Sequence, residues 1–356
     1  MDYEIPELPF SVDLNTSAIL VKLISTHRAL AELKGIANSI PNPTVLMSTL
    51  ALQEARKSSE IENLVTTQDD LYRATIDSPI FHSREAKEVH RYATSLLAGD
   101  QAMRESGLLT MKLIEKIQIQ TLENTAGFRR QGGTVLKDDR TGSVVYTPPQ
   151  TQEDIQRLLS NLEHFINDPE MSQWDPLIKM AVVHHQFESI HPFYDGNGRT
   201  GRMLNVLYLV YLGLLDQPIL YHSRYINQNK PIYYDLLQRV RISEDWEPWI
   251  LFMLDAVETT SKETTHLILE IRRLMQETKV QLRQDTRFYS QDLINTLFKH
   301  PYTKINFFAG EMGISAVTAR NQLEQLVSIG ILSKVRIGRP NYYVNDALVR
   351  LFASVD

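Results

Sequence analysis

The sequence predicts a mainly α protein with one small β-hairpin and a C-terminal winged helix-turn-helix unit. Apolar side chains recur at helical spacing through most of the 356 residues. The pattern changes between residues 127 and 149, where two short β-prone runs flank the turn-rich DDRTG, as in a hairpin. Near the C-terminus, a helix, a turn at Gly313 and a second helix capped by Ser315 precede two further β-prone runs.

The order of the predicted helices suggests how the chain is divided. The first helix runs from Ser17 and stops at the PNP segment 41–43, and the second ends at about Glu62. A long, charged helix at about 245–283 suggests a connector to a separate unit, so we expect a cut near Asp285 to leave catalysis intact. Other helices are expected at about 83–97, 110–123, 150–166, 175–188, 199–214 and 230–241. The expected divisions are an N-terminal helical region (1–104), a central core (105–255), a connector helix (256–284) and the winged helix-turn-helix (285–356).

Composition excludes several classes of protein. With 43% hydrophobic and 22% charged residues, the chain is typical of a globular protein. It has no cysteine, which excludes thiolate metal sites, disulfides and a cysteine nucleophile. This fits a reducing compartment, and the acidic start MDYEIPELPF is unlike a secretory signal, so we expect a cytoplasmic protein. The most apolar run, Met203–Leu215, is shorter than the ~20 residues that a membrane span needs, so we expect no membrane association.

The segment HPFYDGNGRTGR at residues 191–202 has the composition of a phosphate-binding turn. Gly196, Asn197 and Gly198 precede an apolar helix, and glycines allow several N–H groups to point at one anion at a helix N-terminus. Arg199 and Arg202 are three residues apart and share a helical face, where two guanidinium groups can hold adjacent phosphates.

Two further residues of this segment supply the remaining chemistry. Asp195 offers a hard oxygen ligand for a Mg²⁺ that bridges phosphates. His191 is the nearby side chain that can take a proton near neutral pH. A phosphate cradle beside a general base suits phosphoryl or nucleotidyl transfer.

Three other interpretations stay open at this point. GNGRTG matches a dinucleotide-binding G-x-G-x-x-G, with Asp216 20 residues beyond Gly196, although a helical rather than a strand pattern precedes it. His184, His185 and His191 could be metal ligands, although adjacent histidines diverge by about 100° on a helix. The segment could also be a plain glycine turn with capping charges.

The same segment matches the signature HPFx[DE]GNGRxxR at every fixed position, with Tyr194, Thr200 and Gly201 at variable ones. In this it resembles the Fic (filamentation-induced-by-cAMP) family of protein adenylyltransferases. The resemblance covers roughly residues 105–255, through GFRR (127–130), the hairpin ending in YTPP, YYDLL (233–237) and DWEPWILFML (245–254).

The resemblance implies a role for each motif residue. His191 would deprotonate a Ser, Thr or Tyr hydroxyl of a target protein, which would attack the ATP α-phosphate while Mg-pyrophosphate leaves. Asp195 would hold Mg²⁺. Asn197 and the Gly196 and Gly198 amides would form the anion hole. Arg199 and Arg202 would hold the β- and γ-phosphates, and the ATP site would extend over Thr200 and Gly201.

The resemblance also assigns two neighbouring segments. The hairpin would be a flap that docks the target by strand addition, with Val144, Val145 and Tyr146 near the site; an ordinary solvent-exposed hairpin is the alternative. Tyr233 and Tyr234 would lie near the adenine, or would simply pack a helix. Arg241 stands where some relatives carry Asn.

On the second predicted helix, RKSSEIEN fits the inhibitory pattern [ST]xxxE[GN] of the family through Ser58, Glu62 and Asn63. The resemblance implies that Glu62 pairs with Arg202 and occupies the γ-phosphate position, so that ATP binds unproductively. In some members the same glutamate orients water to remove AMP from the target. Without the resemblance, the Ser–Glu pair would be an ordinary helix face.

The C-terminal unit leads to a second functional hypothesis. Thr318, Arg320 and Gln322 would lie on its second helix, with Leu323 and Leu326 packed inside and RIGRP as the wing tip. The net charge of −6 argues against a nucleic-acid binder, but residues 285–356 hold eight Lys/Arg, Lys334, Arg336 and Arg339 among them, against six Asp/Glu. The alternatives to an enzyme are therefore a DNA-binding transcription regulator with a nucleotide-sensing domain, or a wing that binds protein or forms a homodimer.

Overall fold

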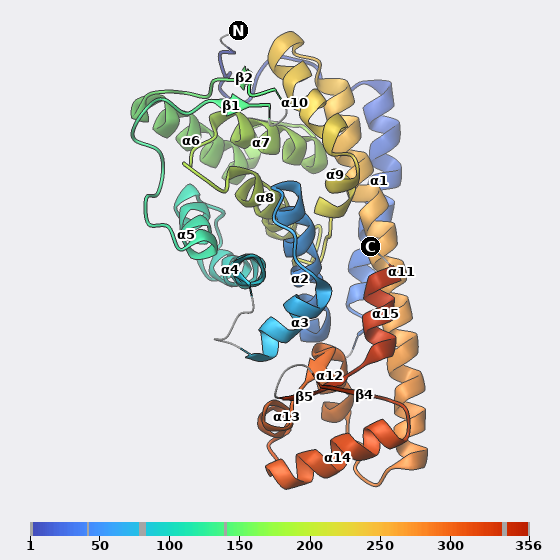
Figure 1. Ribbon diagram of the computed structural model, residues 1–356. Coiled ribbons are helices and arrows are strands. Elements are labelled where there is room, and N and C mark those ends of the chain that lie inside the picture. Colours follow the sequence, from blue (N-terminus) through green and yellow to red (C-terminus); the bar gives the residue numbers. More distant parts are fainter. Residues whose placement is uncertain (1–2, 41–42, 78–82, 139–140, 337–339, 355–356) are drawn as a thin grey trace.

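The computed structural model describes residues 3–40, 43–77, 83–138, 141–336 and 340–354, and the protein is mainly helical, as the sequence predicts (Figure 1). The helices before the hairpin are α1 (Ser17–Ala37), α2 (Pro43–Ile61), α3 (Gln68–Asp77), α4 (Arg84–Ser106) and α5 (Met111–Leu122). After it come α6 (Gln152–Asn167), η1 (Pro169–Met171), α7 (Pro176–Ile190), α8 (Asn197–Tyr211), α9 (Ser223–Gln228), α10 (Lys230–Ser243) and α11 (Trp246–Asp285). The C-terminal helices are α12 (Gln291–Lys299), α13 (Ile305–Met312), α14 (Ala316–Ser328) and α15 (Asp346–Ser354).

Helices α7 and α8 form the centre of the molecule and are buried nearly all round. A helix that is buried on every face must be surrounded by other elements, and here α2, α4, α5, α6 and α11 pack around the pair (Figure 1). The connection between α7 and α8 carries residues 191–196. The first half of the glycine-rich motif is therefore held between two rigid central helices, and the second half begins α8.

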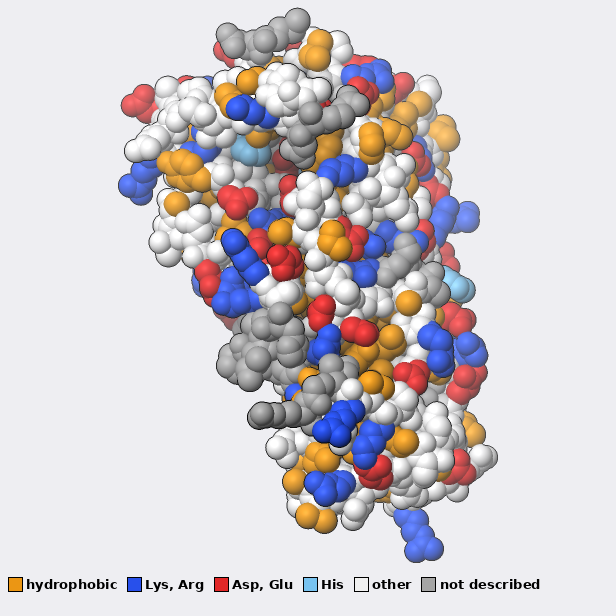
Figure 2. Space-filling model, viewed as in Figure 1, with side chains coloured by type: hydrophobic (Ala, Val, Ile, Leu, Met, Phe, Trp, Pro, Cys, Tyr) orange, Lys and Arg blue, Asp and Glu red, His pale blue; other side chains and the backbone are white. Residues whose placement is uncertain are grey.

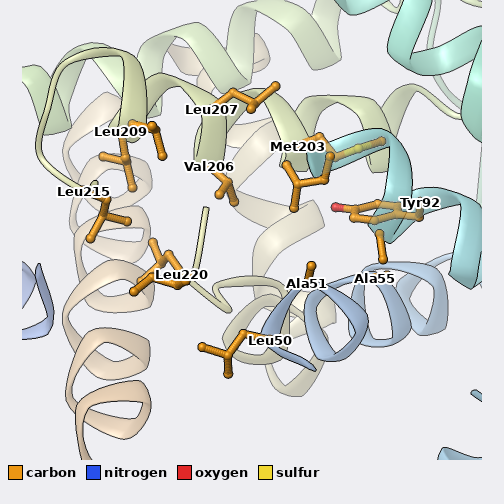
Figure 3. Close-up of a cluster of buried hydrophobic side chains, with 14 of the residues drawn as sticks. Leu50, Ala51, Ala55, Tyr92, Met203, Val206, Leu207, Leu209, Leu215 and Leu220 are labelled. Carbon is orange, nitrogen blue, oxygen red and sulfur yellow. The ribbon is translucent and has the colours of Figure 1, made fainter. Parts of the chain in front are cut away.

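Helix α2 packs directly on this central pair. Figure 3 shows Ala51 and Ala55 of α2 facing Met203 and Val206 of α8, with the Tyr92 ring beside them. Alanine side chains let the two helix backbones approach closely. The face that carries the predicted inhibitory residues is therefore docked onto the helix that carries Arg202.

A buried polar contact fixes the position of α2 further. The Glu54 carboxylate accepts hydrogen bonds from the Ser223 backbone N–H at 3.1 Å and from the Tyr92 hydroxyl at 3.4 Å. Burial raises the pKa of Glu54 to about 7. Because a buried carboxyl group is costly unless its partners are in place, α2 is held in one register on α4 and α9.

The long helix α11 lies beside α1 over much of its length (Figure 1). Lys22 of α1 makes a 2.7 Å ion pair with Glu258 of α11, and Thr26 lies in the interface between the two helices. The boundary that the sequence analysis placed between residues 255 and 256 falls inside this unbroken helix. Within the segment 256–284, buried side chains recur from Ala256 to Leu282, so this part of α11 packs against its neighbours along its length. None of the described helices is long and apolar enough to span a membrane.

The predicted hairpin is present as two short antiparallel strands. Strands β1 (Leu136–Lys137) and β2 (Val144–Tyr146) pair through Leu136 with Tyr146 and Lys137 with Val144. The Asp138 N–H donates to the Ser143 carbonyl at 2.9 Å, which closes the turn. Residues 139–140 of the predicted DDRTG turn lie outside the described residues.

The C-terminal unit combines α12, α13, α14 and α15 with a three-stranded antiparallel sheet in the order β3-β5-β4. The predicted cap of the second helix is confirmed, since Ser315 Oγ accepts from the Thr318 N–H at 3.1 Å. Leu323 and Leu326 are buried, as expected. The predicted wing tip includes residues 337–339, which lie outside the described residues. The strands are β3 (Tyr302–Thr303), β4 (Ser333–Arg336) and β5 (Asn341–Val344).

This unit is not separate from the rest of the protein. The Tyr302 hydroxyl donates to the Asp69 carboxylate of α3 at 2.7 Å, and the Tyr302 ring stacks on Tyr72 at 5.9 Å. Gln53 of α2 donates in turn to the Tyr72 hydroxyl at 2.7 Å. Helix α12 also packs against α2 (Figure 1). The unit therefore supports the N-terminal helices, which the sequence analysis did not anticipate.

We expect that removing residues 285–356 destabilises the remaining fragment instead of leaving it unaffected. The cut exposes the Tyr72 ring and abolishes the Asp69 hydrogen bond, a loss of about 2 kcal/mol. The midpoint of thermal unfolding should fall by roughly 5 °C. Tyr302→Phe in the full chain, which removes only the hydrogen bond, should cause a smaller decrease. An unchanged midpoint in the 1–284 fragment would show that the contacts contribute nothing.

Candidate active site

His191 ends helix α7 in a left-handed conformation, with φ of 49°. Its N–H donates to the Phe187 carbonyl at 2.9 Å, and its own carbonyl accepts from Arg129 Nε at 2.7 Å. Arg129 also donates to the Ile190 carbonyl at 3.3 Å and to the Pro149 carbonyl at 3.0 Å. A fully buried cation thus caps the carbonyl end of α7 and holds the His191 backbone in place.

The surroundings of His191 keep its imidazole neutral. Burial and the nearby charges of Arg129 and Arg241 lower the pKa of His191 to about 4. At neutral pH the ring is therefore unprotonated and can accept a proton.

The glycines of the motif are required by close contacts. Gly196 has φ of 79°, and a Cβ there would lie 2.7 Å from a methyl group of Leu122. A Cβ on Gly198 would lie 2.4 Å from Glu62 Oε1. Within the described chain, α8 starts without a side-chain cap, so its first N–H groups are available to an anion.

Asn197 shapes this turn from within. Its side chain accepts from the Phe193 N–H at 2.8 Å and donates to the Phe193 carbonyl at 2.8 Å. Both functions of the amide are therefore engaged with the backbone, and the side chain is buried. In this arrangement Asn197 holds the turn in the conformation that exposes the first-turn N–H groups of α8.

Arg202 is held by the residues that the sequence analysis named on α2. Its Nη2 donates to Glu62 Oε1 at 2.8 Å and to the Ser58 carbonyl at 2.8 Å, and its Nε donates to Ser58 Oγ at 2.8 Å. Asn63 lies in the turn just beyond α2 with φ of 62°, and its side chain accepts from Lys230 Nζ at 3.2 Å. Ser58 and Glu62 thus clamp one guanidinium from one face of α2.

The exposure of the two charges in this pair differs. The Arg202 side chain is 1% exposed, whereas the Glu62 side chain is 33% exposed. Burial would raise the pKa of Glu62, but the Arg202 charge and hydrogen bond outweigh it and lower the pKa. The carboxylate is therefore ionised at neutral pH, and it lies at the solvent side of the arginine, where an incoming anion would arrive.

Arg199 has a carboxylate partner that the sequence analysis missed. Its Nη1 forms an ion pair with Glu88 of α4, and its Nη2 lies 3.6 Å from Asp195 Oδ1. Arg199 and Glu88 are both largely buried. The two residues are 111 positions apart, and no local pattern in the sequence links them.

Asp195 is suited to a metal ion that arrives with phosphates. Its side chain is 70% exposed, and no group of three or more potential ligands occurs among the described residues. Mg²⁺ is commonly bound through one or two carboxylates, with phosphates and water as the remaining ligands. The exposed Asp195 carboxylate, with Arg199 3.6 Å away, could supply one ligand to such an ion.

Thr200 and Gly201 face the protein interior instead of the open end of α8. Thr200 is buried, and a Cβ on Gly201 would lie 2.7 Å from Glu188 Oε1. Burial raises the pKa of Glu188 to about 7. Both residues therefore lie in the packed contact between α8 and α7, and their part in an ATP site stays a prediction.

Of the residues predicted to lie in the flap or near the adenine, some are exposed and others are buried. Val144 and Val145 are 56% and 42% exposed, whereas Tyr146 is buried and its hydroxyl donates to the Ser189 carbonyl at 2.9 Å. Tyr233 is buried with its hydroxyl 2.8 Å from His184 Nε2, and Tyr234 is 43% exposed. Tyr146 and Tyr233 therefore pack inside the protein.

The histidines considered as metal ligands are also interior residues. His184 bonds to Tyr233, and His185 Nε2 lies 3.2 Å from the Leu237 carbonyl. Burial lowers the pKa of both. Each is a neutral, hydrogen-bonded core residue.

The residues proposed to contact DNA are only partly available. Thr318, Arg320 and Arg336 are exposed, whereas Lys334 forms an ion pair with Glu324. Arg339 lies outside the described residues. On the face shown in Figure 2, Lys/Arg and Asp/Glu side chains are interspersed. DNA binding stays a prediction.

Together the fold and the site define a helical protein in which one motif holds an uncapped helix N-terminus, a buried arginine and a neutral histidine. Comparison with family models is consistent with this class. The Fic/DOC family N-terminal model matches residues 20–101 and the Fic/DOC family model matches residues 108–209. The model of the protein adenylyltransferase SoFic-like C-terminal domain matches residues 274–348. The chain belongs to the Fic/DOC family.

Individual relatives are similar over part of their length. The chain is 32% identical to protein adenylyltransferase Fic of Aedes aegypti over 112 residues, which are 32% of the chain and 21% of that protein. It is 30% identical to the Drosophila ananassae protein of the same name over 226 residues, which are 60% of the chain and 43% of that protein. The chain thus spans less than half the length of these curated relatives.

A solved structure shares the fold over almost the whole chain. A Fic family protein from Desulfovibrio desulfuricans superposes with a TM-score of 0.59 at 20% identity, covering 94% of this chain and 97% of that one. At this identity the similarity concerns the fold, which includes the C-terminal unit.

Proposed function

We propose that this protein transfers AMP from ATP to a Ser, Thr or Tyr hydroxyl of a target protein, and that Glu62 restrains the transfer. The observation that carries the proposal is the juxtaposition of a neutral His191 with the uncapped N-terminus of α8, next to a buried Arg202. The names of the curated relatives support the same reaction class.

The chemistry assigned to the chain is a single displacement at phosphorus. The His191 imidazole takes the proton of the target hydroxyl, and the oxygen forms a bond to the α-phosphorus. The bond from that phosphorus to the oxygen bridging to the β-phosphate breaks, and pyrophosphate leaves. The first-turn N–H groups of α8 stabilise the negative charge on the α-phosphate, and Arg202 orients the terminal phosphates.

Asp195 would hold a Mg²⁺ that enters with ATP, and the ion would offset the charge of the leaving pyrophosphate. Arg199, held by Glu88 from behind, keeps a positive charge 3.6 Å from this carboxylate.

Glu62 restrains the reaction because its carboxylate is already paired with Arg202, the guanidinium that would bind the terminal phosphates of ATP. Glu62 Oε1 accepts from Arg202 Nη2 at 2.8 Å. The same oxygen would lie 2.4 Å from a Cβ placed on Gly198, so it is also close to the α8 N-terminus. A triphosphate placed at the α8 N-terminus would lie close to this carboxylate, and the two negative charges would repel each other. ATP is then bound with its phosphates displaced from the transfer geometry.

We expect the acid limb of the pH profile to lie well below that of an ordinary histidine. A general base loses its function as the pH falls through its pKa, and the pKa of His191 is lowered from 6.5 to about 4. The value of kcat/KM for ATP should therefore stay nearly level as the pH falls from about 7 to about 5. Initial rates in buffers of constant ionic strength measure this. Half-maximal activity near pH 6.5 would contradict the assigned environment of His191.

The proposal is tested by incubating the purified chain with ATP labelled at the α-phosphate and with labelled γ-phosphate in parallel. Transfer of AMP labels protein from the first substrate only. Label from the γ-phosphate would indicate a kinase, and no label from either, even after Glu62→Gly, would favour the nucleotide-sensing alternative.

A further inference from the structure

Arg241 of α10 contacts both the flap and the end of α7. Its guanidinium carbon lies 4.0 Å from the centroid of the Tyr146 ring on β2. Its Nε donates to Ser189 Oγ at 3.1 Å, two residues before His191. A cation over an aromatic face and a hydrogen bond to a fixed hydroxyl each restrain the groups that they join.

The same arginine also orients a neighbouring amide. Arg241 Nη1 donates to Gln238 Oε1 at 2.8 Å, and Gln238 Nε2 donates to the Val145 carbonyl at 2.8 Å. Because the amide oxygen is engaged by Arg241, its NH₂ group is aimed at the flap. Val145 has no Cα partner on β1, so Gln238 supplies the contact that the hairpin itself does not.

These contacts connect the flap to His191 along a short path. Tyr146 is held twice at the end of α7, by its hydroxyl on the Ser189 carbonyl at 2.9 Å and by its ring under Arg241. The preceding residue, Val145, is held by Gln238. Among the described residues, the groups that contact Arg241 by hydrogen bond or ring stacking are the uncharged Tyr146, Ser189 and Gln238, and Glu188 acts on it through its charge. The direct contacts of Arg241 therefore join the flap, α10 and the end of α7.

We propose that Arg241 is a positioning residue that fixes strand β2 relative to His191, so that a target segment lying against the flap presents its hydroxyl to the base. The inference rests on the proposed AMP transfer for its catalytic consequence. The phosphates of ATP would lie at α8, and among the described residues the hydrogen bonds and ring contact of Arg241 go to other elements. Loss of Arg241 therefore separates target positioning from ATP binding.

The test uses the full chain in the Glu62→Gly background, with Arg241→Met as the variant and Arg239→Met as the matched control. Arg239 lies on the same helix, is exposed and pairs with Asp245, and among the described residues it makes no hydrogen bond or ion pair with the flap. Hydrogen exchange at Val144–Tyr146 should quicken about tenfold in Arg241→Met, equivalent to about 1.4 kcal/mol, and should not change in Arg239→Met. With α-labelled ATP and lysate proteins of the source cell as acceptors, the maximal rate should fall about tenfold while the KM for ATP stays the same.

Two further variants keep the proposal falsifiable. Arg241→Lys retains a cation for the Tyr146 ring but cannot reach Ser189 and Gln238 together, so partial rescue is expected. Gln238→Ala removes only the Val145 contact and should also quicken exchange there, even if Arg241→Met does not fold. Unchanged exchange at β2 in both Arg241→Met and Gln238→Ala would overturn the positioning role. If the Glu62→Gly parent transfers no AMP, the proposed function fails, and the exchange measurement still decides whether Arg241 holds the flap.

Discussion

Replacing His191 by Ala should reduce AMP transfer by roughly 10²–10⁴-fold, the usual contribution of a general base. ATP should still bind, because its phosphates are expected at α8 and not at the imidazole. The physical reason is that the described site offers this neutral histidine at the end of α7, with its backbone held by Arg129. Rates with labelled ATP and the Kd for ATP measure the two effects separately.

A suitable control for this variant is His164→Ala. His164 is an exposed residue of α6. Its ring contacts Asp168, which is not part of the 191–202 motif. Transfer by the control should equal that of the parent. If His191→Ala kept more than about a tenth of the parent rate, the base would have to be another group.

Replacing Glu62 by Gly should increase AMP transfer by roughly 10- to 150-fold. Charge-assisted contacts of this kind contribute about 1.5–3 kcal/mol, and about 1.4 kcal/mol corresponds to a factor of ten. The freed Arg202 then meets the terminal phosphates without competition. The measurement is the initial rate of AMP incorporation, with mass spectrometry of the adducts, where self-modification should also become easier to detect.

Two variants show whether the charge of Glu62 is responsible. Glu62→Gln keeps the size of the side chain but weakens its hold on Arg202, so an intermediate gain is expected. Glu62→Gly combined with Arg202→Ala should lose the gain, because the nucleotide then lacks the freed arginine. A fast double variant would mean that relief of inhibition does not act through Arg202.

The sequence predicts most of the secondary structure and the core of the site, because both depend on local patterns. The helices around α7 and α8 follow from apolar periodicity, and the 191–202 motif places its own residues at one helix junction. The contact between Glu62 and Arg202 spans 140 positions, yet it was predictable because the family pattern carries it.

Other contacts have no local signature. Glu88 pairs with Arg199 because α4 crosses the start of α8, and nothing near Glu88 in the sequence reveals this. The burial of Tyr146 and Tyr233 likewise depends on how β2 and α10 pack on α7. A tyrosine suits both a ligand site and a core, so residue type alone could not decide its place.

The sequence also does not predict where the C-terminal unit packs on the rest of the protein. Its own helices and strands follow from local signals such as the Ser315 cap. Its attachment depends on Tyr302, Tyr72 and Asp69, which belong to segments more than 200 residues apart in the chain. Only the folded arrangement shows that this unit supports the helices that lead to Glu62.

The roles of His191 and Glu62 are tested most directly by AMP incorporation in three full-length chains: wild type, Glu62→Gly, and Glu62→Gly with His191→Ala. Each is incubated with α-labelled ATP and Mg²⁺ under the same conditions, and labelled protein is quantified. We expect weak labelling by the wild type, labelling at least tenfold stronger by Glu62→Gly, and loss of that labelling in the double variant. Equal labelling by all three chains would contradict these roles, because neither His191 nor Glu62 would then control transfer.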